Sequence, residues 1–77
     1  MGFAEKIYAL RTQAGMSQAY LAETLQVSRQ TVSKWELGTS YPEIEKLLAI
    51  SGLFHVTTDY LLKEQPASQE SAKLDRL

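Results

Sequence analysis

One short segment, residues 28–36, concentrates side chains whose chemistry could read nucleic-acid bases. A helical rotation of about 100° per residue places Val32 and Trp35 on one face of this segment. The opposite face carries four polar side chains and no acid: Arg29, Gln30, Ser33 and Lys34. Arginine and lysine donate to O6 and N7 of guanine, and a glutamine amide pairs with N6 and N7 of adenine. The pattern therefore predicts a helix whose exposed face contacts base edges in DNA.

A second short helix is expected directly before this one. Ser17 is a good N-cap for it, and Ser28 is a good N-cap for the base-reading helix. Ala22 is small enough to lie where two such helices cross. Apolar residues supply the inner faces: Leu21, Leu25, Val27 and Val32. Two short helices joined by a tight turn form a helix-turn-helix. The helical rotation also turns Glu36 and Ser28 toward the protein interior.

Three further helices complete the expected domain. A first helix has one apolar face, which is formed by Phe3, Ile7, Leu10 and Ala14. Glycines are expected to end the first and third helices, at Gly15 and Gly38. Pro42 suits the first turn of a fourth helix that runs to Phe54, and Thr57 caps a fifth helix over 58–62. The sequence thus predicts an all-α, five-helix domain.

The domain is expected to span residues 1–62, and residues 63–77 form a polar linker or C-terminal tail. The linker interpretation rests on a run of polar residues with one proline, Pro66. A short dimerising helix in this segment is the alternative.

Length and composition narrow the function classes. The chain has 77 residues, no cysteine and one histidine, which excludes disulfides, thiolate metal sites and two-histidine zinc sites. The chain has eight Lys and Arg and nine Asp and Glu residues, so its formal net charge is −1, whereas DNA-binding domains are commonly basic. No phosphate loop, carboxylate pair or catalytic triad is indicated, so we expect no enzyme, metal, cofactor or small-molecule ligand. No apolar run reaches the about 20 residues of a membrane helix, and no signal peptide is indicated, so we expect a cytoplasmic protein.

Residues 3–62 resemble the lambda-repressor-like (Cro/cI-type, XRE) helix-turn-helix domains. The matching positions are Ile7, Leu10, Arg11, Gly15, Ser17, Gln18, Leu21, Ala22, Leu25, 27–36, Gly38, Pro42, Leu47 and 59–62. The resemblance implies a five-helix fold that binds a palindromic DNA operator as a homodimer. Gln26 departs from the pattern, because glycine is common at that turn, where φ tends to be positive.

The resemblance also assigns roles to individual residues. Base reading is assigned to Arg29, Gln30, Ser33 and Lys34. Contacts to the DNA backbone are assigned to Gln18, Ser17, Ser28, Thr31, Thr39, Ser40 and Tyr41, with Gln18 also bracing the base-reading side chains. Arg11 and Glu36 are expected to form a structural ion pair. The alternative for Arg11 is a phosphate contact, and the two roles are compatible.

For several residues, a structural or solvent-exposed role is the main expectation. Trp35 is expected to be a core residue rather than a DNA contact, and His55 a solvated or capping side chain. Tyr20 and Tyr41 are interpreted as surface aromatics, and a solvated helix face is expected at Glu43, Glu45 and Lys46. For dimerisation, the best candidate surface is formed by Leu53, Phe54, Val56, Tyr60 and Leu61, and some of these residues are expected to belong to the monomer core.

Two function classes remain. The favoured one is a sequence-specific transcriptional regulator, a repressor in the first instance. The alternative is a module of the same fold that binds a protein partner such as a toxin or a sensor. Low net charge leaves the alternative open, because phosphate neutralisation supplies most non-specific affinity for DNA. Arg29 and Lys34 nonetheless share the exposed face, and this clustering outweighs the total charge.

Overall fold

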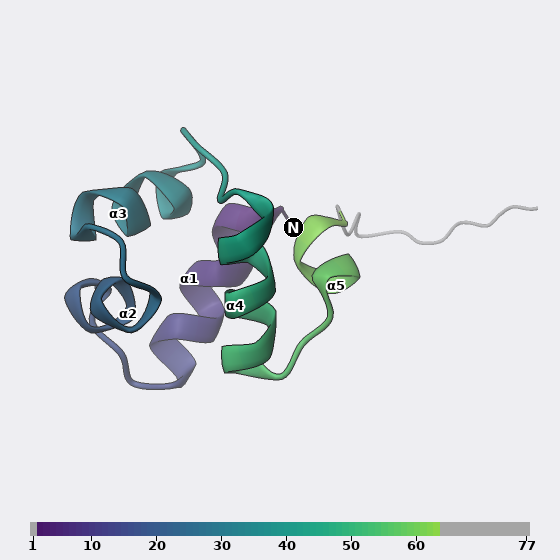
Figure 1. Ribbon diagram of the computed structural model, residues 1–77, viewed down its shortest axis with the longest axis horizontal. Coiled ribbons are helices and arrows are strands. Elements are labelled where there is room, and N and C mark those ends of the chain that lie inside the picture. Colours follow the sequence, from purple (N-terminus) through teal and green to yellow (C-terminus); the bar gives the residue numbers. More distant parts are fainter. Residues whose placement is uncertain (1, 64–77) are drawn as a thin grey trace, which may run out of the picture.

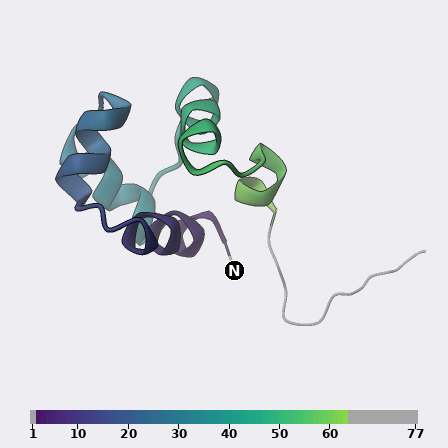
Figure 2. The ribbon, with the colours of Figure 1, turned by 90° about the horizontal axis from the view of Figure 1, so that it is seen from below.

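The computed structural model describes residues 2–63 and contains five helices over that range (Figure 1). They are α1 (Phe3–Gln13), α2 (Gln18–Leu25), α3 (Arg29–Leu37), α4 (Ile44–Phe54) and α5 (Thr58–Leu62). In two perpendicular views, α2 and α3 lie at one end of the domain and α5 lies at the other, beyond α4 (Figures 1 and 2). The predicted all-α, five-helix class is confirmed. The predicted tail lies outside the described residues from position 64 onward.

The predicted caps set the helix boundaries. The hydroxyl groups of Ser17, Ser28 and Thr57 each accept a backbone N–H from the residue three positions later, at 3.0 to 3.1 Å. Gly15 and Gly38 adopt left-handed backbone angles, with φ of 75° and 80°. Helices of 5 to 11 residues are too short to be stable alone, so these caps act together with tertiary packing.

The fourth helix differs from its expected bounds. It begins at Ile44 with Glu43 as the N-cap, so Pro42 lies in the preceding extended segment rather than in the first turn. Glu43 takes extended backbone angles as the N-cap, with ψ of 169°, so the residues before it stay outside the helix. Gly52 does not interrupt the helix, which ends at Phe54; His55 follows as the C-cap with a left-handed φ of 58°.

The core lies where the five helices meet. Its buried apolar residues are Phe3, Ile7, Leu21, Ala22, Leu25, Val32, Trp35, Leu47, Ile50 and Leu61. Trp35 is a core residue, as expected, and its ring packs edge-on against Phe3 at a centroid distance of 6.5 Å. The helix α1 also buries two cations that its apolar pattern did not predict, Lys6 and Arg11.

Candidate nucleic-acid interface

The turn between α2 and α3 fixes how the two helices cross. Gln26 takes a left-handed conformation with φ of 61°, although it carries a side chain where glycine is common. The N–H of Gln26 donates to the Glu23 carbonyl at 3.1 Å, and the N–H of Val27 donates to the Ala22 carbonyl at 2.9 Å. These bonds close the end of α2, and Ala22 is buried where the helices pack. The pair forms a helix-turn-helix.

The outer face of α3 is polar. Arg29, Gln30 and Lys34 are exposed, and Ser33 is half-buried beside them. The opposite face is fixed by Val32 and Trp35, which are buried in the core. The structure therefore brings the four predicted base-reading side chains to one surface.

Ser28 does not lie on the inner face that the helical rotation predicted. Its side chain is exposed, and its hydroxyl caps α3 and lies 2.9 Å from the Thr31 hydroxyl. The expectation was wrong because an N-cap residue has extended rather than helical backbone angles, with ψ of 156° here. Ser17 is likewise an exposed N-cap.

A buried ion pair joins α1 to α3. Arg11 Nε donates to Glu36 Oε2 at 2.6 Å, and Arg11 Nη2 donates to Glu36 Oε1 at 3.2 Å. Only 11% of the Arg11 side chain and 6% of the Glu36 side chain are exposed. Arg11 Nη1 also donates to the Met16 carbonyl at 2.7 Å. Hydrogen bonding to the Glu36 carboxylate raises the pKa of Arg11, so the guanidinium stays charged.

Gln18 extends this ion pair toward the exposed face of α3. Its Nε2 donates to Glu36 Oε1 at 3.0 Å, and its Oε1 accepts from Arg29 Nη1 at 3.3 Å. A carboxylate can only accept and a guanidinium can only donate, so these two partners fix which way the Gln18 amide points. The contacts form a continuous chain from Arg11 through Glu36 and Gln18 to Arg29, and this chain orients the Arg29 side chain.

The segment after α3 has fewer free donors than the resemblance implied. The N–H of Gly38 donates to the Trp35 carbonyl at 3.2 Å, and the N–H of Thr39 donates to the Lys34 carbonyl at 3.0 Å. The Thr39 hydroxyl donates to the same Lys34 carbonyl at 3.2 Å. Backbone contacts to DNA from this segment would therefore come from Ser40 and Tyr41.

Tyr41 is an exposed aromatic side chain with a defined position. Its ring packs on Phe3 at a centroid distance of 5.7 Å while 70% of the residue remains accessible. Tyr20, on α2, is also exposed, as expected.

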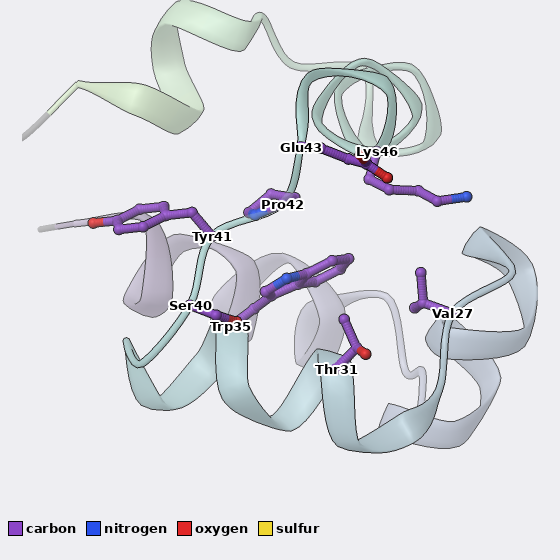
Figure 3. A pocket seen from close by; sticks show the side chains of 8 residues that line it. All are labelled: Val27, Thr31, Trp35, Ser40, Tyr41, Pro42, Glu43 and Lys46. Carbon is purple, nitrogen blue, oxygen red and sulfur yellow. The ribbon is translucent and has the colours of Figure 1, made fainter.

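A groove of about 380 Å³ runs beside α3, between this helix and the start of α4 (Figure 3). It is lined by Val27, Thr31, Trp35, Ser40, Tyr41, Pro42, Glu43 and Lys46. The Lys46 side chain points toward the α2–α3 turn, and Tyr41 lies at the other end of the groove (Figure 3).

Lys46 was expected on a solvated face, but its ammonium donates to the Leu25 carbonyl at 2.8 Å. It therefore holds the end of α2, while Glu43 and Glu45 are exposed.

Other classes of site find no support in the described part of the chain. Residues 2–63 contain no cluster of three His, Cys, Asp or Glu side chains able to hold a metal ion. Within the same residues, none of the helices has the length and apolar character needed to cross a membrane.

Comparison with known proteins agrees with this geometry. A family model described as helix-turn-helix matches residues 7–61. The HTH-type transcriptional activator BcrR of Enterococcus faecalis is 52% identical over 62 residues, which are 80% of this chain and 30% of BcrR. Repressor protein C2 of Salmonella phage P22 is 39% identical over 59 residues, 77% of this chain and 27% of that relative. The chain therefore spans less than a third of the length of these two relatives.

A solved structure shows the same arrangement of helices. The crystal structure of the P22 c2 repressor in complex with synthetic operator 9T superposes with a TM-score of 0.78 at 36% identity. The match covers 82% of this chain and 96% of that chain. The fold and the exposed α3 define a helix-turn-helix domain. The chain belongs to the lambda-repressor-like (XRE-type) helix-turn-helix family that its sequence resembles.

Proposed function

We propose that this protein is a sequence-specific DNA-binding transcriptional regulator that reads double-stranded operator DNA in the major groove through α3. The observation that carries the proposal is the exposed face of α3, where Arg29, Gln30 and Lys34 stand together without an acidic side chain. The relatives include both an activator and a repressor. Repression is the effect that we propose for this protein. A cytoplasmic location and the lack of catalytic activity are part of this proposal.

The balanced net charge does not argue against DNA binding. Non-specific affinity depends on cations that meet phosphates, and Arg29 and Lys34 share one surface. The acid nearest to them in α3 is Glu36, whose charge is neutralised by Arg11 inside the domain. The charge presented by α3 is therefore positive, although the whole chain is not.

The proposed contacts fall into two groups. Arg29, Gln30, Ser33 and Lys34 face the bases, and Gln18 holds Arg29 in position while meeting a phosphate. The remaining proposed backbone contacts lie at the N-caps of α2 and α3, within α3 and in the segment after it: Ser17, Ser28, Thr31, Ser40 and Tyr41. Thr39, which the resemblance also assigned, is left out because its N–H and its hydroxyl both donate to the Lys34 carbonyl.

Binding as a homodimer to a palindromic operator is the second part of the proposal, because one helix reads only a few base pairs. Part of the surface expected from the sequence belongs to the monomer core, as predicted. Leu61 is fully buried in the core, and Leu53, Phe54 and Val56 pack against it. The exposed apolar side chains of α4 and α5 are instead Ile44, Leu48, Tyr60 and Leu62. We assign the dimer contact to this set.

Two substitutions separate base reading from backbone contact. Gln30→Ala should cost about 1–3 kcal/mol on the preferred site and relax the choice of base there. Tyr41→Phe keeps the ring on Phe3 but removes the hydroxyl, so it should weaken preferred and scrambled duplexes by similar factors. Gln13→Ala is the matched control, because Gln13 is an exposed glutamine outside the proposed interface. Fluorescence anisotropy on the two duplexes measures all three, and equal effects of Gln30→Ala and Gln13→Ala would contradict the proposal.

One observation favours the second candidate, a module that binds a protein. Leu37 is 73% exposed and lies one turn after Ser33, on the same side of α3 as the polar face. An exposed leucine is better suited to an apolar partner than to phosphates. If wild-type protein shows no preference for any duplex sequence, this candidate replaces the first.

A further inference from the structure

Lys6 is the most deeply buried charged residue of the described chain, with 1% of its surface exposed. Its ammonium group donates to the carbonyl oxygens of Tyr60 and Lys63. It also lies 4.8 Å from the centroid of the Tyr60 ring, a distance at which the ring face attracts a cation. All three contacts reach the C-terminal end of α5 from α1.

The end of α5 needs such a partner. A helix leaves its last carbonyl groups without internal partners, and its dipole makes this end favourable for a cation. The helix has five residues, of which only Leu61 is buried. Helices of this length do not persist without tertiary contacts. Lys6 therefore supplies hydrogen bonds from α1 to the end of α5, and Leu61 supplies the buried apolar contact of this helix.

A second buried cation on α1 holds the other end of the domain. Arg11, five residues after Lys6, binds Glu36 of α3. The helix α1 packs against both α3 and α5, which lie at opposite ends of the domain (Figures 1 and 2). Through Lys6 and Arg11, α1 connects the last helix of the domain to the helix proposed to read DNA.

We propose that Lys6 is a positioning residue that fixes the end of α5 relative to α3, so that the dimer contact and the DNA-reading helix keep a constant separation. The inference rests on the proposed function, because a dimer must place its two α3 helices about 34–36 Å apart. Loosening α5 would leave each half-site contact intact and impair only the simultaneous binding of two half-sites.

Lys6→Met tests this role in the full 77-residue chain, since methionine keeps an apolar stem of similar shape but has no donor. Losing a hydrogen bond to a charged group raises the local opening equilibrium of the segment that it holds by about 10- to 100-fold. We expect that increase in hydrogen exchange for the amides of Leu61 and Lys63, which donate within α5. Lys46→Met is the matched control, because it removes another lysine-to-carbonyl bond, at the end of α2. It should leave α5 unchanged, and Lys6→Arg, which keeps a charge and N–H donors, should retain more of the protection than Lys6→Met.

Affinity for DNA distinguishes a positioning role from a purely structural one. A purely structural role of Lys6 would not change the preference between a duplex with two half-sites and a duplex with one. The probes are a duplex with two copies of the half-site selected by the wild-type protein and a duplex with one copy. We expect Lys6→Met to lose several-fold of its preference for the two-copy duplex and to bind the one-copy duplex as the wild type does. Unchanged exchange in α5, or faster exchange with an unchanged preference, would overturn the inference. The exchange experiment needs no DNA, so it tests Lys6 separately from the proposed function.

Discussion

Replacing Glu36 with alanine removes the carboxylate that neutralises the buried guanidinium of Arg11. Arg11 would keep the Met16 carbonyl as a hydrogen-bond partner and the Tyr8 ring 5.4 Å away, neither of which carries a negative charge. Gln18 would lose its acceptor on α3. Removing one member of a buried ion pair typically costs about 3–5 kcal/mol, because the other charge stays buried without compensation. A domain of this size loses about 4–8 °C in Tm per kcal/mol. Glu36→Ala should therefore lower Tm by at least about 12 °C.

Thermal unfolding followed by far-UV circular dichroism measures this effect. Glu45→Ala is the control, because Glu45 is an exposed acid whose loss should cost less than about 1 kcal/mol. The double variant Arg11→Met with Glu36→Leu should recover most of the loss, since it removes both buried charges together. Similar small shifts for Glu36→Ala and Glu45→Ala would refute the reasoning.

Two further predictions concern stability. Hydrogen bonding to its own backbone N–H, and then to the N–H of Gly2 at 2.9 Å, lowers the pKa of the Glu5 carboxylate from its ordinary value of 4.5. The unfolded chain then binds the proton more readily, so this contribution to stability is present above pH 4.5 and is lost as the pH falls through the lowered pKa. In urea unfolding at a series of pH values, the free energy of unfolding of Glu5→Gln should fall less steeply at acid pH than that of the wild type. Parallel curves of unfolding free energy against pH would contradict this prediction. Gln26→Gly should raise the free energy of unfolding by about 0.5–1 kcal/mol, because glycine adopts the left-handed φ of 61° without steric cost. A loss of stability in urea unfolding would instead show that the Gln26 side chain contributes to the turn.

Most of the fold could be predicted because its signals are local. Ser17, Ser28 and Thr57 cap helices through side chains that reach only three residues along the chain. Gly15 and Gly38 mark helix ends because left-handed angles favour glycine over any other residue. The exposed face of α3 followed from rotation alone, and rotation failed only at Ser28, where the backbone is not yet helical.

The contacts of Lys6 and Lys46 could not be predicted in the same way. Lys6 binds carbonyl groups 54 and 57 residues away, and Lys46 binds one 21 residues away. Any backbone carbonyl can accept a hydrogen bond, so no residue type in the sequence marks these partners. The one available signal for Lys6 is its spacing of four residues from Leu10, which places both on one side of α1.

The link from Gln18 to Arg29 has a different origin. It depends on the angle at which α2 crosses α3, and this angle follows from the packing at Ala22 and the turn at Gln26. The sequence identified both ends of the contact as polar residues of one interface. Only the folded geometry shows that Gln18 meets Arg29 and Glu36 at the same time.

The measurement that tests the central claim most directly is a selection from random double-stranded oligonucleotides with the purified 77-residue protein. Sequence reading by α3 in a homodimer predicts an enriched palindrome whose two half-sites lie about one helical turn apart. Selection with Gln30→Ala should lose the preference at one position of each half-site and keep the rest. Recovery of no common sequence, with binding that depends only on salt concentration, would contradict the claim that this domain reads an operator.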